Sequence, residues 1–416
     1  MGNNSAPEIR FAGFTDAWEQ RKLGELLEYN IITEQSDGNH GELYPKSSEF
    51  TNKGIPYLSA SNINNNDIDY QDIKYLPLER ARKFKKGVAQ DGDILLAHNA
   101  TVGPSVLLKT DYPFVILSTT LTLYRVNKNQ MDNHFFLNAI RSGMIQNQLK
   151  IMMKQTTRNQ VPILAQRTMN IAYPKSLQEQ TQIGTFLAEL DHLITLHQRK
   201  LNNIKSLKAG LLQKMFPKKG EDFPEIRFPG FTDAWEQRKA KDLFNPIAEK
   251  GHDKLPVLSV TQEFGVVYRE EVGIDIKYDP STLKDYKVIH PGDFVISLRS
   301  FQGGFELSDK LGITSPAYTI FKPKETKEQD NLFWKTQFKT FKFIESLKTI
   351  TFGIRDGKSI SFSEFGDLRL QFPSNKDEQV KIGQFFSSLD NLNVLHQREL
   401  NALKETKKAF LQKMFV

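Results

Sequence analysis

Two long stretches of this 416-residue chain repeat one another and carry the spacing of a coiled coil. The first, Glu179–Phe216, places apolar residues alternately four and three positions apart, which builds one hydrophobic seam along a helix. The second, Glu378–Phe415, is identical to it at 21 of 38 positions. An exposed rod of this kind needs a partner. Because a contact between two copies of one surface is self-complementary, we expect the helices to pair antiparallel about a pseudo-twofold axis.

Polar residues interrupt this seam at matched places. His197 and Lys208 take two seam positions of the first stretch, and His396 stands where His197 stood. Polar seam residues commonly set the register of paired helices. A metal or catalytic role for the two histidines is the alternative, and we favour register.

A second repeat shows that the whole chain is a duplication. Pro7–Lys22 returns at Pro224–Lys239 with 15 of 16 positions identical, and we call these two segments the opening motifs. Each opening motif is followed by a diverged block, roughly 28–175 and 245–374, and then by a long helix. The blocks still align at an offset of 200 residues, since Gly92–Leu95 corresponds to Gly292–Val295.

The local patterns of the diverged blocks favour sheet over helix. β-branched and aromatic runs bounded by Gly, Pro and Asn predict strands at Gly92–Ala97, Pro113–Arg125, Asp293–Leu298 and Ala317–Phe321. Helical patterns are fewer, at Asn133–Met152 and Leu332–Leu347.

The predicted fold class is therefore α+β. We expect two mixed, sheet-dominated globular domains separated by a long antiparallel coiled-coil pair, with an internal pseudo-twofold duplication. The expected boundaries are 1–178 for the first domain, 179–217 for the first spacer helix, 218–377 for the second domain and 378–416 for the second spacer helix.

Composition excludes several classes of protein. The chain contains no cysteine, which rules out disulfides and thiolate zinc sites and fits a reducing, cytoplasmic location. Its apolar runs are short, so we expect no membrane span. The net charge of +7 leans only slightly towards a polyanionic partner. A duplicated frame with diverged inserts suits a protein that reads two unlike half-sites at a fixed separation.

The sequence resembles the specificity subunits of type I restriction–modification systems over essentially its whole length. The likeness rests on the repeated FTDAWEQRK of the opening motifs, the LSxxNI-like Leu58–Ile63, the GDIL turn at Gly92–Leu95, and helices that begin with EQ and end with QKMF. The second block departs from it at Leu258–Gln262, which lacks the Asn-Ile ending.

The resemblance implies two target recognition domains that grip the two parts of a split sequence in double-stranded DNA. It also implies that catalysis belongs to partner chains and that this chain is not an enzyme. Those partners would be two methyltransferase subunits that use S-adenosylmethionine, and restriction–translocase subunits that use ATP and Mg. This chain itself would hold no cofactor.

Catalytic and metal motifs are weak throughout. Gly353–Ser359 ends in GKS but is one residue too short for a phosphate loop, and Asn245–Ile247 only begins like the adenine methyltransferase tetrad. The eight histidines form no metal-spaced pair. Asn64–Asp72 lacks the glycine and terminal glutamate of a calcium loop. We expect no catalytic residue and no metal ligand in this chain.

Base reading needs hydrogen-bonding side chains on short loops that reach groove edges. Three loops of each block offer them, and their chemistry differs at matched places. The first block provides Ser59, Ser61, Asn62, His98, Asn99, Thr101, Arg158, Asn159 and Gln160. The second provides Ser259, Thr261, Gln262, Arg299, Ser300, Gln302, Arg355 and Lys358. The plain alternative for any one of them is a solvated loop tip.

Two further sets of residues are candidates for contacts outside the base edges. Lysines at 83, 85, 86, 335, 339, 342 and 348 could position phosphates, although such runs are more often a solvated face. Trp18 and Trp235, in the near-identical opening motifs, are candidates for binding the two methyltransferase subunits.

Two other functional classes stay open at this point. The chain could carry its own nuclease or methylase chemistry, which an assay of the purified chain alone would detect. It could also be a coiled-coil adaptor whose domains bind protein or glycan, which an absence of sequence-dependent DNA binding would favour.

Overall fold

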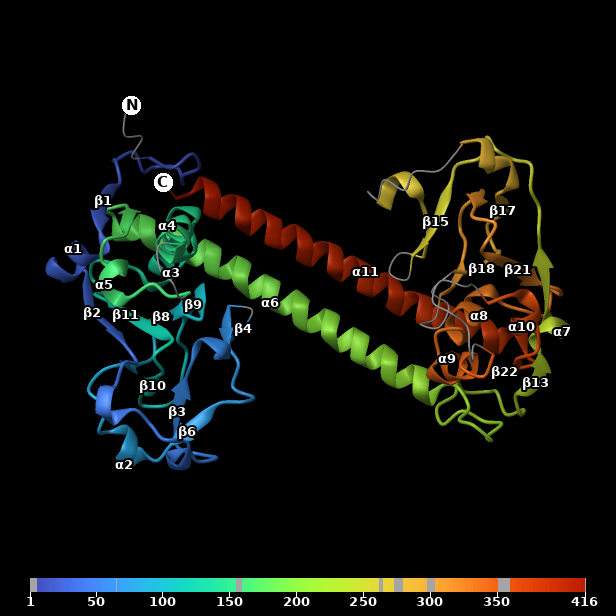
Figure 1. Ribbon diagram of the computed structural model, residues 1–416, viewed down its shortest axis with the longest axis horizontal. Helices are drawn as coiled ribbons and strands as arrows, with labels where there is room; N and C mark the ends of the chain where they lie inside the picture. Colours follow the sequence, from blue (N-terminus) through green and yellow to red (C-terminus); the bar gives the residue numbers. More distant parts are fainter. Residues whose placement is uncertain are drawn as a thin grey trace. The chain divides into compact units, whose positions relative to one another are not determined.

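The computed structural model describes residues 6–64, 66–154, 159–261, 265–272, 280–297, 304–350 and 360–415. The chain divides into two compact units. The first unit contains Met1–His197 with Arg398–Val416, and the second contains Gln198–Gln397. Each long helix therefore contributes one part to each unit, as the colours of Figure 1 allow the reader to follow.

The first unit is built mainly from short strands (Figure 1). In chain order its elements are β1 (Glu19–Lys22), α1 (Leu23–Glu28), β2 (Ile32–Asp37), β3 (Ile55–Leu58), β4 (Ile63–Asn64), β5 (Asp67–Ile68), β6 (Lys74–Leu76), α2 (Leu78–Ala81), β7 (Val88–Ala89), β8 (Ile94–Asn99), β9 (Thr101–Leu107), β10 (Val115–Leu117), β11 (Leu121–Val126), α3 (Asn133–Arg141), α4 (Gly143–Lys154), α5 (Ile163–Gln166), β12 (Asn170–Tyr173) and the first part of α6 (Leu177–Lys214).

Two four-stranded sheets organise this unit. One has the order β2-β11-β8-β9 and is antiparallel throughout, and the other has the order β6-β3-β10-β7 with β10 parallel to β3. Helices α3 and α4 lie against β9. The central strand β8 is buried from Ile94 to His98, because its two faces meet two different hydrophobic clusters. This strand carries the loop at Asn99–Thr101 to the surface.

The second unit repeats this plan with shorter strands (Figure 1). Its elements are the last part of α6, β13 (Glu236–Lys239), α7 (Ala240–Leu243), β14 (Phe244–Ile247), β15 (Leu258–Thr261), β16 (Gly265–Tyr268), β17 (Lys287–Ile289), β18 (Phe294–Ile296), β19 (Phe305–Leu307), β20 (Gly312–Thr314), β21 (Thr319–Pro323), α8 (Asn331–Gln337), α9 (Phe341–Leu347), α10 (Phe362–Gly366), β22 (Arg369–Phe372) and the first part of α11 (Lys376–Lys413).

Phenylalanines fill the core of the second unit. The sheet β14-β21-β18-β19 lies over fully buried rings that include Phe244, Phe294, Phe321 and Phe338. Phe294 and Phe321 stack with ring centroids 5.4 Å apart, and Phe244 meets Phe321 edge-on at 5.2 Å. These phenylalanines thus serve the core of the second unit rather than an exposed surface.

The long helices pair antiparallel within each unit, which confirms the predicted arrangement. In the first unit the start of α6 packs against the end of α11, where the rings of Phe186 and Phe410 are 4.9 Å apart. In the second unit the end of α6 packs against the start of α11, where Lys208 forms an ion pair with Asp390. Phe216, just beyond α6, lies 6.1 Å from Phe386. Relative to the repeated stretches Glu179–Phe216 and Glu378–Phe415, both helices begin and end two residues earlier, so the closing Met-Phe pairs lie beyond the helix ends.

Other expected elements prove to be divided. The predicted strand Pro113–Arg125 is two strands, β10 and β11, in different sheets. The predicted helix Asn133–Met152 breaks at Ser142, whose extended backbone and bond to the Ala139 carbonyl separate α3 from α4. Leu332–Leu347 breaks in the same way at Thr340, which caps α9 by accepting from the Phe343 N–H. Helical periodicity continues across both breaks, so the pattern alone did not reveal them.

Candidate nucleic-acid interface

Two of the polar loops nominated in the first block meet at Thr120. The first loop, Ser59–Asn62, follows β3, and the Ala60 N–H donates to Thr120 Oγ1 at 2.8 Å. The second loop follows β8, and the His98 N–H donates to the Thr120 carbonyl at 3.0 Å. One residue in the turn before β11 therefore holds both loops in place.

The third loop joins the second directly. The Ala100 N–H donates to the Asn159 carbonyl at 2.9 Å, and Asn99 and Gln160 form an antiparallel bridge. The Val161 N–H then donates to the His98 carbonyl at 2.8 Å. All three nominated loops of the first block thus form one cluster, which we call the loop cluster, although they lie up to 101 residues apart in the chain.

Side chains of the loop cluster differ in what they offer to a ligand. Ser61, Thr101 and Asn159 are exposed, whereas Asn99 and Gln160 are half-buried. Asn62 is 9% exposed, and its Oδ1 accepts from both the N–H and the hydroxyl of Ser59 at 2.9 Å. His98 is 5% exposed and lies beneath the loops. Arg158 lies outside the described residues.

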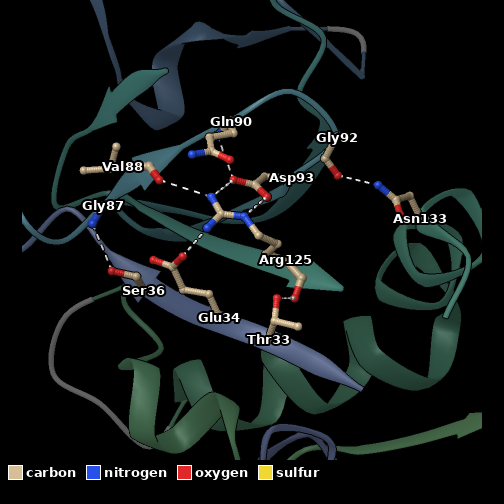
Figure 2. A network of polar contacts seen from close by, with 10 residues as sticks. All are labelled: Thr33, Glu34, Ser36, Gly87, Val88, Gln90, Gly92, Asp93, Arg125 and Asn133. Carbon is tan, nitrogen blue, oxygen red and sulfur yellow. Dashed lines mark hydrogen bonds and ion pairs between the residues drawn. The ribbon is translucent and has the colours of Figure 1, made fainter. Parts of the chain in front are cut away.

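A charged network supports the turn before β8 (Figure 2). Asp93 is almost fully buried and accepts from Arg125 Nε at 2.8 Å and from Arg125 Nη2 at 2.6 Å. The same guanidinium pairs with Glu34 on β2. The Gly92 carbonyl accepts from the Asn133 side chain at 2.5 Å, which ties the turn to the start of α3. The glycine–aspartate pair recognised in the sequence is therefore a structural joint between sheet and helix.

The second unit has an aspartate equivalent to Asp93 but no arginine equivalent to Arg125. Asp293 accepts from the His290 N–H at 2.8 Å, and the register of β21 places Lys322 where β11 has Arg125. Burial raises the pKa of the Asp293 carboxyl above its usual range.

Only part of the second block's nominated set can be placed. Ser259 and Thr261 lie on β15, which pairs with β16, and both are half-buried. Ser259 Oγ accepts from Arg269 Nε at 3.4 Å. The other nominated residues, Gln262, Arg299, Ser300, Gln302, Arg355 and Lys358, lie outside the described residues.

Two of the lysines considered for phosphate contact are engaged inside the protein. Lys339 forms an ion pair with Glu306 at 2.5 Å. Lys342 donates to the carbonyls of Pro217 and Lys218 and to Gln371 Oε1. Lys342 therefore fastens the segment that follows α6.

The tryptophans of the opening motifs are buried, each at 3% exposure. Trp18 packs edge-on against Phe135 and Phe415, and its Nε1–H donates to Glu179 Oε1 at 3.2 Å. Trp235 packs in the same way against Phe216 and Phe333. Their indoles join the block to the end of a long helix. The three residues before each tryptophan, Thr15–Ala17 and Thr232–Ala234, are exposed.

The EQ pair at the start of each long helix completes this joint. Arg10 donates twice to Glu179, at 2.6 and 2.8 Å, and Arg227 donates twice to Glu378, at 2.7 and 2.8 Å. Gln180 is fully buried, accepts from the Asp132 N–H and donates to the carbonyls of Gln130 and Pro174. Gln379 repeats this with Asp330, Glu328 and Pro373. The repeated EQ pair of the sequence thus makes the same contacts at the start of both long helices.

The polar seam residues form ion pairs between the helices. In the first unit Lys407 pairs with Asp191 at 2.6 Å, and in the second unit Lys208 pairs with Asp390. His197 Nδ1 lies 3.0 Å from a Glu399 carboxylate oxygen in the first unit. These contacts match polar residues across the helix pair, as a role in register requires.

Comparison with known proteins assigns the family. The family model for the type I restriction modification DNA specificity domain matches residues 15–206 and 232–405. Two relatives from Methanocaldococcus jannaschii are each 23% identical: the putative type I restriction enzyme MjaX specificity subunit, over 95% of this chain and 92% of its own length, and the type I restriction enzyme MjaVIII specificity subunit, over 95% and 91%.

A solved structure shares the fold. The S subunit of the type I restriction–modification system from M. genitalium is 13% identical, with a TM-score of 0.64 over 99% of each chain. Among the residues that the structure describes, no helix combines the length and apolar character needed to cross a membrane. With two matched copies of the family's domain over most of its length, this chain belongs to the type I restriction–modification DNA specificity family.

Proposed function

We propose that this chain is the non-catalytic subunit that recognises a bipartite DNA sequence and directs partner methyltransferase and restriction subunits to it. The observation that carries this proposal is the loop cluster, in which three polar loops from distant parts of one block converge on one surface. Family membership supplies the ligand class, which is DNA. The recognised DNA would be double-stranded.

The loop cluster has the chemistry that base reading needs. Ser61, Thr101 and Asn159 carry donors and acceptors into solvent, and Asn99 and Gln160 stand beside them. Amide side chains of this type pair with adenine, and hydroxyls pair with either kind of base edge. In the second unit the same task falls to Ser259 and Thr261 together with Gln262, Arg299, Ser300, Gln302, Arg355 and Lys358.

The long helices would set the distance between the two half-sites. Each has 38 residues, and at about 1.5 Å of rise per residue such a helix is on the order of 57 Å long. The ion pairs Asp191–Lys407 and Lys208–Asp390 would hold the register on which that distance depends. The spacer between the half-sites would then be unread and constant.

Two methyltransferase subunits would dock at equivalent places on the two repeats. Leu193 and Leu196 are exposed on α6, and their repeat equivalents Leu392 and Leu395 are exposed on α11. Paired exposed leucines on a helix suit a protein partner. The exposed Thr15–Ala17 and Thr232–Ala234 would add the same polar contacts at both places.

Catalysis and cofactors would belong to the partners. S-adenosylmethionine would bind to the methyltransferase subunits, and ATP and Mg would bind to the restriction–translocase subunits. This chain would supply only position and selectivity. The cysteine-free composition fits assembly of this complex in a reducing cytoplasm.

Methylation-aware sequencing tests the proposal. DNA from cells that express this chain with its cognate methyltransferase should carry a modified split motif, with two short defined halves around a fixed gap. The motif should disappear when this chain is omitted. If the partner binds this chain and no motif is modified, the proposal is wrong and the adaptor class takes its place.

A further inference from the structure

A chain of buried polar side chains runs beneath the loop cluster. Thr122 Oγ1 lies 2.7 Å from His98 Nδ1 and accepts from Gln166 Nε2 at 3.0 Å. Gln166 Nε2 also donates to the Val161 carbonyl at 2.8 Å, and its Oε1 accepts from the Tyr124 hydroxyl at 2.5 Å. Thr122, Tyr124 and Gln166 are fully buried. Sequence patterns gave no signal for this network, because its members come from β11 and α5 and are not adjacent in the chain.

The surrounding hydrogen bonds favour the tautomer of His98 that carries its proton on Nε2. The Val161 carbonyl can only accept, so the Gln166 amide must point its nitrogen towards Val161 and Thr122. Thr122 Oγ1 therefore accepts from Gln166, and His98 Nδ1 is the acceptor in reach of its own hydrogen. His98 is then neutral with its proton on Nε2. Burial, which lowers the pKa of His98, favours the same neutral form.

The second unit shows that the fold does not need this network. The registers of β11 and β21 match Thr122 with Thr319 and Tyr124 with Phe321, and α10 has Phe365 at the place of Gln166. There the rings of Phe321 and Phe365 are 4.7 Å apart, and Thr319 Oγ1 donates directly to the Ile360 carbonyl at 2.8 Å. The sequence has Leu298 at the place of His98. The fold therefore does not require these polar side chains, which suits a functional role for the network in the first unit.

We infer that His98 is a specificity-determining residue of the first unit, held by Thr122 and Gln166 as a fixed Nε2–H donor at the floor of the loop cluster. The inference rests on the proposed function. Among the described residues the hydrogen bond of the His98 ring is made by Nδ1, which leaves the Nε2 N–H for a ligand. A base-edge acceptor reaches it directly or through one water.

Fixing the tautomer is what makes this residue selective. A neutral imidazole that is free to exchange tautomers donates to purine N7, guanine O6 or thymine O4, and accepts from the amino groups of cytosine or adenine equally well. A fixed Nε2–H donor meets an acceptor and leaves an amino group unpaired. The network therefore adds rejection of the wrong base to attraction of the right one.

Substitution of matched threonines tests the inference. Thr122→Val removes the donor to His98 Nδ1, whereas Thr319→Val removes the equivalent hydroxyl of the second unit, where no histidine depends on it. Each variant and His98→Gln are expressed with the cognate methyltransferase, and the modified motif is mapped by methylation-aware sequencing. We expect Thr122→Val and His98→Gln to reduce discrimination at one base pair of one half-motif by roughly tenfold. Thr319→Val should leave that half unchanged.

A second readout does not depend on DNA. Nitrogen-15 NMR of the full chain labelled at histidine, with His98 assigned by its absence in His98→Gln, should show the Nε2–H tautomer. Thr122→Val should convert that signal to a mixture of tautomers. The Nδ1–H form in the unmodified chain would overturn the inference.

The sequencing outcomes separate this inference from the proposed function. An unchanged motif in both Thr122→Val and His98→Gln would overturn the role of His98 while leaving the split motif intact. Equal loss of methylation on every sequence, with one base pair no more affected than the rest, would also overturn it, because it would mean a structural role only. Absence of any split motif with the unmodified chain would instead refute the proposed function.

Discussion

Asp191 on α6 and Lys407 on α11 form an ion pair at 2.6 Å, and Arg141 from α3 joins the same carboxylate at 3.0 Å. Lys407 is 6% exposed, and burial lowers the pKa of its ammonium. The equivalent pair of the second unit, Lys208–Asp390, is more open, with side chains 22% and 40% exposed. The two repeats thus contain equivalent ion pairs, of which the one in the first unit is more buried than the one in the second.

Because the two ion pairs differ in burial, replacing the aspartate by asparagine should change stability by different amounts in the two units. Asp191→Asn leaves Lys407 and Arg141 buried without a carboxylate, and should lower the free energy of unfolding of the first unit by about 3 kcal/mol. Asp390→Asn should change stability by less than about 1 kcal/mol. Urea unfolding of both variants measures this, and equal effects would contradict the burial argument.

Replacing glycine by alanine at two positions of α6 should change the stability of the chain in opposite directions. A Cβ at Gly184 would lie 2.4 Å from Asp132 Oδ1 and 2.7 Å from the Phe135 nitrogen, because the start of α3 sits directly on the helix. Gly184→Ala should destabilise the chain by about 1–3 kcal/mol. A Cβ at Gly210 would have no atom within 4 Å, so Gly210→Ala should stabilise by up to about 1 kcal/mol through helix propensity.

Thermal unfolding of these two variants, and of Gly383→Ala as a repeat of the first, provides the measurement. Gly383 faces the start of α8 as Gly184 faces α3, with Asp330 Oδ1 2.6 Å from the place a Cβ would take. A rise in melting temperature for Gly184→Ala would refute the close approach.

The acid sensitivity of the opening motif should depend on Glu19. A hydrogen bond from Arg21, with further bonds from Lys175 and Tyr173, lowers the pKa of Glu19 to about 2. Because the folded pKa lies below the ordinary value of 4.5, the stabilisation is fully present above pH 4.5 and is lost as the pH falls towards 2. Glu19→Gln should flatten the dependence of stability on pH in this window.

Glu236→Gln is the matched control for that measurement. Glu236 lies opposite Phe372 on β22, whereas Glu19 lies opposite Tyr173 on β12, so the second opening motif lacks the hydroxyl that binds Glu19. Glu236→Gln should flatten the pH profile less. The reverse order would show that Tyr173 does not contribute.

The two aspartates of the GD turns should also differ. Asp93→Asn takes a charged partner from Arg125 and should destabilise the first unit by about 2 kcal/mol. Asp293→Asn should be neutral or stabilising at pH 7, because it removes a buried charge and keeps an acceptor for the His290 N–H. Urea unfolding at pH 7 compares them, and a larger loss for Asp293→Asn would contradict this explanation.

The helices should control the spacer of the recognised sequence. Removal of one heptad from each helix keeps the seam in register and shortens each by about 10 Å. We expect methylation-aware sequencing to show both half-motifs unchanged and the gap altered. An unaltered gap would refute the proposal that the helices measure distance.

The duplication, the helical seams and the fold class are visible in the sequence because each is a local pattern repeated along the chain. The apolar spacing of Glu179–Phe216 needs no knowledge of distant residues, and the nomination of three loops required only their polar letters. The same local patterns failed at Ser142 and Thr340, where one hydroxyl ends a helix while the periodicity continues.

Burial and partnership were decided only by the tertiary structure. Trp18 looks like a surface anchor in the sequence, yet it packs against Phe415, almost 400 residues further along the chain. His98 looks like an exposed reader, and its surroundings come from Thr122 and Gln166. Hydrogen bonds depend on distances of about 3 Å between atoms. Only the folded chain brings residues from separate strands and helices that close, so no pattern along the sequence could reveal them.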